Sequence, residues 1–224
     1  MKQINIERKI TKARNLSITV YQNGRVVLKH PARYPKHQIE SFLTEKTEWI
    51  QKKLQSITKD IPNKLNFAEG ESFPIFGKLY PILNIEKGCY WDPENGFFIQ
   101  PLDQVLIRQK KAKLILKSLL QNKVNPIIKE YERTLNTKVN KVSYKPMRSL
   151  WGSCNSKNEI SINLSLVHCP DFVIEYIVVH EMAHTLQHNH SKKFWEIVNS
   201  QIPNYKLAEK WLKDIGKKYI YYLN

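Results

Sequence analysis

The sequence predicts an α+β fold, and three patterns along its 224 residues point to that class. Apolar and polar residues alternate between residues 4 and 30, which is typical of half-buried strands. Short β-type runs separated by glycines occupy residues 62–101. Apolar residues recur at helical spacing in two long segments, 36–57 and 104–135, and again near the carboxyl terminus. We therefore expect antiparallel β-hairpin layers with one helix in the amino-terminal part, followed by a part that mixes helices with a small antiparallel sheet.

The first elements are expected to be an antiparallel meander and a helix. Alternating apolar residues run from Ile4 to Leu28, and Asn23-Gly24 is a strong signal for a two-residue hairpin turn. Pro35 then precedes segment 36–57, whose apolar residues lie mostly at helical spacing. The spacing predicts an amphipathic helix over that segment.

A second hairpin-rich layer and a long helix should follow. The β-type runs of the layer lie at residues 73–76, 79–85 and 97–99. Segment 104–135 has one apolar side and is expected to be helical, with a break or kink at Asn125-Pro126, because proline lacks an amide hydrogen.

The carboxyl-terminal part is expected to contain two strands and three helices. The strand-like segments 139–144 and 160–163 flank a turn that contains glycine and serine. Helical patterns then cover residues 171–188, 191–201 and 205–216.

Length and composition limit the domain organisation. The 224 residues fit one large domain or two small ones, and a hydrophobic content of 42% is enough for a core. We expect a β-rich amino-terminal region over residues 1–104 and a second region over residues 105–224, with one continuous domain as the alternative.

Several features favour a cytoplasmic protein with no membrane partner. No apolar run approaches the roughly 18 residues that a bilayer crossing requires, and the first five residues lack the apolar stretch of a signal peptide. An odd number of cysteines without a C-x-x-C pair argues against a disulfide scaffold or a cysteine-based zinc ribbon. The cysteines are Cys89, Cys154 and Cys169.

The net charge of +16 leaves two interpretations open. Residues 106–146 hold 11 basic and 2 acidic side chains, which is most of the excess. Lysine-rich helix faces are commonly only solvated surface. The same segment could instead face a polyanion such as DNA or RNA, so nucleic acid is an alternative partner.

The stretch His180-Glu181-Met182-Ala183-His184 is the H-E-x-x-H signature of zinc metalloproteases. On a helix, positions 180 and 184 lie on one face, about 6 Å apart along the axis, so both imidazoles can bind one ion. Glu181 then lies beside the metal, where its carboxylate can act as a general base. The apolar residues on nearly every side indicate a buried helix, and unpaired imidazoles there would cost roughly 1–3 kcal/mol per group.

A catalytic zinc needs a third protein ligand, and His190 is the preferred candidate. If the helix continued, His188 would lie about 12 Å along the axis from His180, too far to share an ion with it. Asn189 tolerates the conformation that ends helices, so His190 can fold back toward the metal. Glu196 and Glu209 remain the alternative third ligands.

Several short sequence motifs, taken in their order along the chain, resemble those of a known family. The sequence resembles the YgjP-like metallopeptidases, relatives of the SprT-like and WLM zinc peptidases. The similarity rests on W-G-S-C at 151–154, I-S-I-N-L at 160–164, Y-I-V-V-H-E-M-A-H at 176–184 and N-H-S at 189–191 with Phe194-Trp195. The amino-terminal β-pattern looks similar as well.

The resemblance implies a zincin-like metallopeptidase core, with an active-site helix beside the small sheet. It implies zinc held by His180, His184 and His190, with Glu181 as general base. The family usually has arginine directly before the tryptophan of W-G-S-C, whereas this chain has Leu150 there and Arg148 two residues earlier.

Three further expectations concern the neighbours of this motif. Gly152 should permit a tight turn or bulge, and Ser153 and Cys154 should be structural rather than nucleophilic. Strand 159–163 is expected to offer an edge to a peptide substrate. His168 is expected to be a surface loop histidine, with oxyanion stabilisation as the alternative.

The function expected from the sequence is therefore zinc-dependent hydrolysis of peptide bonds in a peptide or protein substrate. Two alternatives remain. One is a zinc-stabilised basic module that binds nucleic acid, and the other is a peptidase recruited to DNA-bound proteins.

Overall fold

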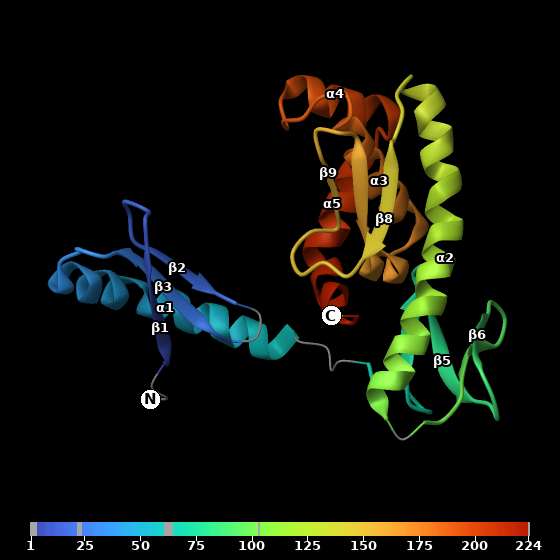
Figure 1. The fold of residues 1–224 in the computed structure, drawn as a ribbon, viewed down its shortest axis with the longest axis horizontal. Coiled ribbons are helices and arrows are strands. Elements are labelled where there is room, and N and C mark those ends of the chain that lie inside the picture. Colours follow the sequence, from blue (N-terminus) through green and yellow to red (C-terminus); the bar gives the residue numbers. More distant parts are fainter. Residues whose placement is uncertain (1–3, 22–23, 61–64, 103, 224) are drawn as a thin grey trace. The chain divides into compact units, whose positions relative to one another are not determined.

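The computed structural model describes residues 4–21, 24–60, 65–102 and 104–223 and confirms the α+β class (Figure 1). The chain divides into two compact units, Met1–Ile61 and Pro62–Asn224. The division lies well before the boundary expected after residue 104. The reason is that the middle β-layer shares one hydrophobic core with the carboxyl-terminal elements.

The first unit contains one sheet and one helix. Its strands are β1 (Ile6–Thr11), β2 (Ser17–Val20) and β3 (Val26–Pro31), and its helix is α1 (Lys36–Asp60). Strands β2 and β3 form the expected antiparallel pair, while Asn23 of the predicted turn lies outside the described residues.

The expectation of a purely antiparallel meander is wrong. The strand order is β1-β3-β2, and β1 pairs with β3 in parallel. Alternation identifies a strand and its buried face, but it does not select the neighbouring strand. Leu28 from the sheet packs with Ile39 and Leu43 of α1 to form the core of this unit.

The second unit begins with a four-stranded sheet and a long helix. The strands are β4 (Ser72–Ile75), β5 (Lys78–Asn84), β6 (Cys89–Asp92) and β7 (Gly96–Ile99), in the order β4-β5-β7-β6. Helix α2 (Val105–Thr134) continues through Pro126, so of the expected break or kink at Asn125-Pro126 the break does not occur. Val124 and Ile128 are buried on either side of this proline, so packing offsets the roughly 3 kcal/mol that it costs.

A three-stranded sheet and the carboxyl-terminal helices complete the unit. Strands β8 (Lys141–Lys145), β9 (Gly152–Cys154) and β10 (Glu159–Asn163) are ordered β8-β10-β9. The helices that follow are η1 (Leu164–His168), α3 (Asp171–Ala183), α4 (Lys192–Gln201), α5 (Tyr205–Asp214) and η2 (Gly216–Tyr221).

This small sheet is mixed rather than antiparallel, because β10 pairs in parallel with β8 and antiparallel with β9. Strand β10 is therefore central. Both of its edges are paired, which overturns the expectation that segment 159–163 offers a free edge. Strand β9 instead forms the edge of the sheet that lies near His180 and Glu181 of α3.

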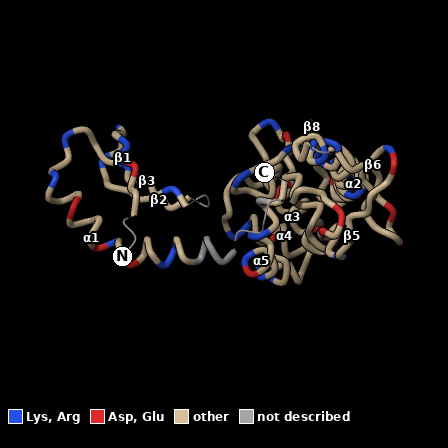
Figure 2. The backbone as a smooth tube through the Cα atoms, turned by 90° about the horizontal axis from the view of Figure 1, so that it is seen from below, with Lys and Arg blue, Asp and Glu red and all other residues tan. Residues whose placement is uncertain are grey.

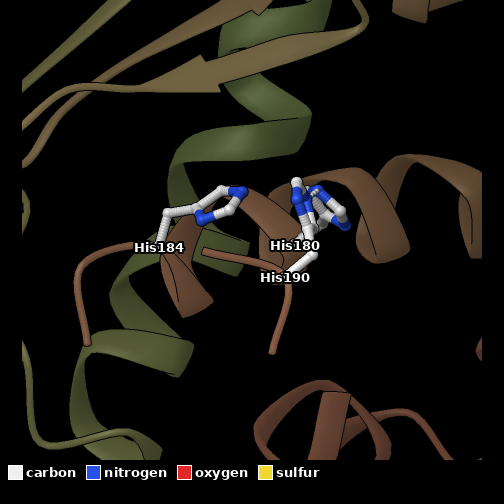
Figure 3. Close-up of side chains that lie close together, drawn as sticks. All are labelled: His180, His184 and His190. Atoms are coloured by element: carbon white, nitrogen blue, oxygen red, sulfur yellow. Dashed lines mark hydrogen bonds between the residues drawn. The ribbon is translucent and has the colours of Figure 1, made fainter. Parts of the chain in front are cut away.

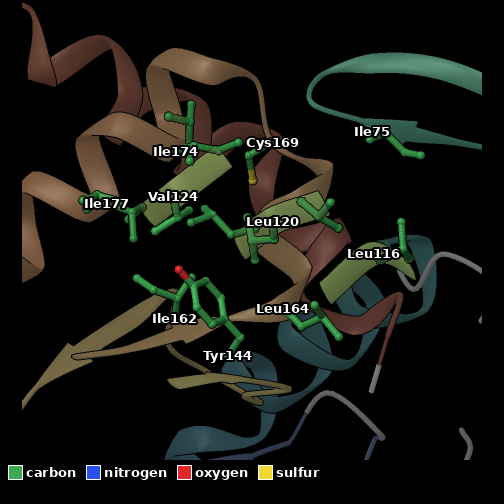
Figure 4. Close-up of a cluster of buried hydrophobic side chains, with 14 of the residues drawn as sticks. Ile75, Leu116, Leu120, Val124, Tyr144, Ile162, Leu164, Cys169, Ile174 and Ile177 are labelled. Atoms are coloured by element: carbon green, nitrogen blue, oxygen red, sulfur yellow. The ribbon is translucent and has the colours of Figure 1, made fainter. Parts of the chain in front are cut away.

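Helix α3 lies in the middle of the core, as the apolar residues on nearly every side of it predict (Figure 4). Ile174 and Ile177 of α3 face Leu120 and Val124 of α2, with Tyr144 of the sheet nearby. The helix ends at Ala183, five residues before the predicted end, because the amides of Thr185 and Leu186 bond carbonyls only three residues back. In the part of the chain that the structure describes, no helix is long and apolar enough to cross a membrane.

Candidate metal centre and active site

Three histidine side chains converge on one point at the end of α3 (Figure 3). His180 lies in the last turn of α3, His184 is the residue that caps its carboxyl end, and His190 comes from the loop before α4. One nitrogen of each ring lies within 4.8 Å of the other two. The structure thus brings together all three histidines that the sequence selected.

The spacing of these nitrogens suits a shared ion. The Nε2 atoms of His180 and His190 face each other at 3.1 Å. Two nitrogens that each bind a tetrahedral metal at 2.0–2.1 Å are about 3.3 Å apart. Three imidazoles in this arrangement fit a metal ion with one coordination position left open.

The other ring nitrogens of His180 and His184 have partners that leave Nε2 available. His184 Nδ1 lies 3.1 Å from the carbonyl of Gln187, and His180 Nδ1 lies 3.4 Å from the hydroxyl of Tyr176. Burial, with the charges of His184 and His190, lowers the pKa of His180 to about 4. His180 is therefore neutral near pH 7, which is the form that binds metals.

The loop after α3 holds His190 in place. The side-chain oxygen of Asn189 accepts hydrogen bonds from Gln187 Nε2 at 2.7 Å and from the amide of Ser191 at 3.2 Å. Phe194 of α4 is fully buried, and its ring lies 4.5–4.9 Å from the rings of all three histidines. The sequence showed the Phe194-Trp195 pair but did not reveal that Phe194 supports the histidines.

The alternative ligands lie elsewhere. His188 is exposed and lines the cleft without joining the cluster. Glu196 is 3.7 Å from Lys192 on the surface of α4. Glu209 of α5 lies in the cleft, where it contacts Tyr176 rather than the three nitrogens.

Glu181 is buried beside the cluster, and Gly152 of β9 makes room for it. A Cβ atom on Gly152 would lie 2.6 Å from both Cγ and Oε1 of Glu181. The glycine is therefore required for close approach rather than for the turn or bulge expected from the sequence. Burial raises the pKa of Glu181 to about 8, and a cation bound nearby would lower that pKa again.

A cleft of about 520 Å³ opens onto the histidines and Glu181. One wall is formed by residues 149–154, which include β9, and another by side chains of α3 and α5. Leu150 lies in this wall and is 53% exposed, at the position where the resemblance leads one to expect arginine. Burial and the charge of Glu181 raise the pKa of Cys154 to about 11, so its thiol is a poor nucleophile.

His168 is not the surface residue expected from the sequence. It is fully buried in η1, with Nδ1 2.7 Å from the carbonyl of Pro74 and with Phe73 and Tyr222 packed against its ring. Burial lowers its pKa to about 4. His168 does not line the cleft, so it supports the fold rather than the candidate site.

Convergent imidazoles, a buried carboxylate and an open cleft on an α+β fold are the arrangement that metal-dependent hydrolases use. The chain belongs to the YgjP-like metallopeptidase domain family, whose model matches residues 14–215. The resemblance seen in the sequence is thereby confirmed, and membership of the family implies a metal ion.

Two solved structures are similar in fold. One is the metallopeptidase zymogen abylysin of Pyrococcus abyssi, with 19% identity and a TM-score of 0.39, covering 42% of this chain and 96% of that one. The other is the zymogen jannalysin of Methanocaldococcus jannaschii, with 25% identity and a TM-score of 0.36, covering 42% and 95%. Comparison with curated proteins gave no significant match.

Proposed function

We propose that this protein is a zinc-dependent metallopeptidase in which His180, His184 and His190 hold the ion and Glu181 is the general base. The observation that carries the proposal is the convergence of three imidazole nitrogens within 4.8 Å beside a buried carboxylate. Imidazole ligands with an open fourth position favour zinc over magnesium or calcium, which prefer oxygen ligands.

A zinc ion in this position would supply Lewis-acid activation of water and of the scissile carbonyl. Glu181 accepts the proton from the attacking water and delivers it to the departing amine. Gly152 leaves room for the Glu181 carboxylate in the cleft wall, which allows the base to lie beside the three histidines.

Strand β9 is the proposed binding edge for the substrate backbone. The backbone groups of Trp151, Ser153 and Asn155 face β10 and bond to it. Asn163 N donates to Trp151 O at 2.9 Å, and Asn155 N donates to Glu159 O at 3.1 Å. In an antiparallel pair the intervening residues direct their amides and carbonyls outward. Gly152 and Cys154 therefore offer backbone groups along the cleft, where a peptide can add as a strand.

Metal content tests the proposal first. We expect about one zinc per chain by elemental analysis of protein purified without a metal-affinity tag, and a sharp loss in His190→Ala. His188→Ala is the matched control, because His188 is an adjacent exposed histidine outside the cluster. Absence of zinc from the wild type would contradict the proposal.

Glu181→Gln tests the assigned base. The variant should bind zinc as the wild type does but should not cleave a library of quenched fluorescent peptides. Wild-type rates in Glu181→Gln would show that another group transfers the proton.

A second function is favoured by one observation, the run of basic residues along and after α2, coloured blue on the backbone in Figure 2, several of which are exposed. A nucleic acid could bind there, either as the main ligand or to recruit the peptidase to DNA-bound proteins. The exposed cations include Lys110, Lys129, Arg133, Lys138, Lys141 and Lys145. Binding of duplex DNA that weakens steeply between 50 and 200 mM salt would support this function, whereas no binding at the lower salt would exclude it.

We place the protein in the cytoplasm, because Cys89, Cys154 and Cys169 all carry free thiols, as a reducing compartment allows.

A further inference from the structure

We infer that Glu209 of α5 positions His180 for metal binding through the hydroxyl of Tyr176. This inference rests on the proposed function, because it assigns a role toward the same metal. It also gives a role to a cleft carboxylate that is not one of the three converging ligands.

Two hydrogen-bond contacts link Glu209, Tyr176 and His180 in series. The Tyr176 hydroxyl donates to Glu209 Oε1 at 3.3 Å, and the same oxygen lies 3.4 Å from His180 Nδ1. Tyr176 and His180 are one helical turn apart on α3, whereas Glu209 comes from α5, 33 positions beyond Tyr176.

Proton counting determines the direction of both bonds. A tyrosine hydroxyl has one hydrogen, and the carboxylate of Glu209 can only accept it. The hydroxyl must then accept from His180, which requires the hydrogen of that ring to be on Nδ1. The lone pair of His180 Nε2 is consequently free and points to where it meets His190 Nε2 at 3.1 Å.

The surroundings of Tyr176 keep its hydroxyl in place. The side chain is 3% exposed, and its ring stacks on Tyr205 at 6.2 Å with an interplanar angle of 16°. Tyr205 stacks in turn on Trp195 at 5.3 Å and 20°. The stacked rings hold the hydroxyl between Glu209 and His180, so loss of Glu209 would free its hydrogen for donation to His180.

Reversal of that bond would put the hydrogen of His180 on Nε2 and oppose metal binding. Partners of this kind typically change metal affinity 10- to 100-fold. We therefore expect Tyr176→Phe and Glu209→Ala each to weaken zinc binding by about that factor, measured by competition with a chromophoric chelator. Glu196→Ala is the matched control, since Glu196 is another exposed carboxylate, paired with Lys192 outside the cleft.

A double variant separates positioning from a general structural effect. Because Glu209 acts only through Tyr176, the variant Tyr176→Phe/Glu209→Ala should lose no more affinity than Tyr176→Phe alone. Additive losses would overturn the inference, as would single variants that bind zinc within twofold of the wild type.

The tautomer of His180 provides a readout that does not need the metal. Long-range proton–nitrogen NMR spectra of wild-type protein stripped of metal should show His180 protonated on Nδ1, and Glu209→Ala should shift it toward Nε2. A wild-type His180 protonated on Nε2 would refute the positioning role even if the protein binds zinc. Failure of the proposed function is distinct, because it appears as a wild type without stoichiometric zinc.

Discussion

Gly152→Ala is the substitution whose effect follows most directly from the geometry. The added Cβ would lie 2.6 Å from Cγ and Oε1 of Glu181, and ordinary contact begins at 3.4 Å. The difference, 3.4 minus 2.6, means that the Glu181 side chain or β9 must retreat by at least about 0.8 Å. A displacement of about 1 Å in an active site typically costs about 100-fold in rate, or about 2.7 kcal/mol.

Two measurements on the same preparation check this prediction. Initial rates of peptide cleavage should fall about 100-fold, while zinc content should stay at the wild-type level, because the three atoms nearest the added Cβ all belong to Glu181 and not to a histidine. Ser143→Ala is the control for a substitution in the same sheet, since β8 lies at the far edge from the cleft. If Gly152→Ala cleaves at more than about a third of the wild-type rate with zinc bound, close packing against Glu181 does not position the base.

Three further predictions concern stability and chemistry. The pKa of His168 is about 4 in the folded protein, against 6.5 for the ordinary side chain. Between these two pH values the unfolded chain binds more protons than the folded one, so the free energy of unfolding decreases as the pH falls from 6.5 toward 4. The loss of unfolding free energy should approach about 3 kcal/mol. Urea titrations at pH 7 and pH 4.5 should therefore show a smaller change in stability for His168→Phe than for the wild type. An equal change in both proteins would contradict the role given to His168. Removal of the proposed zinc ion by a chelator should lower the thermal midpoint, since a ligand at a thousand times its Kd contributes about 4 kcal/mol. An unchanged midpoint would contradict a metal site that binds more tightly in the folded chain. Cys154→Ser should keep most of the cleavage rate, because the wild-type thiol is protonated; an inactive variant that still binds zinc would implicate this side chain.

Local sequence signals predicted much of the candidate site. The H-E-x-x-H spacing places two histidines on one helical face, and Asn189 before His190 indicated where the chain could turn back. The structure brings the three histidines together because they come from one short segment of the sequence, residues 180–190.

Features that depend on distant contacts could not be predicted in this way. The role of Gly152 becomes visible only when β9 packs on α3, and the contact of Tyr176 with Glu209 requires α5 to lie beside α3. Strand partners were mistaken for the same reason, since alternation specifies a face and not a neighbour. His168 looked like a loop residue because its short helix and its packing against Phe73 leave no periodic pattern.

The three converging histidines all fall within residues 180–190, and this has a consequence for the order of assembly. Closing so short a loop costs little chain entropy, so the metal-binding segment can form early, once α3 is helical. Glu181, in contrast, packs against Gly152 of β9, a strand that lies far from α3 in the sequence and is paired with β10. We therefore expect the histidine cluster to form before Glu181 is in place, so that a newly made chain would bind the proposed ion before it is able to cleave peptides.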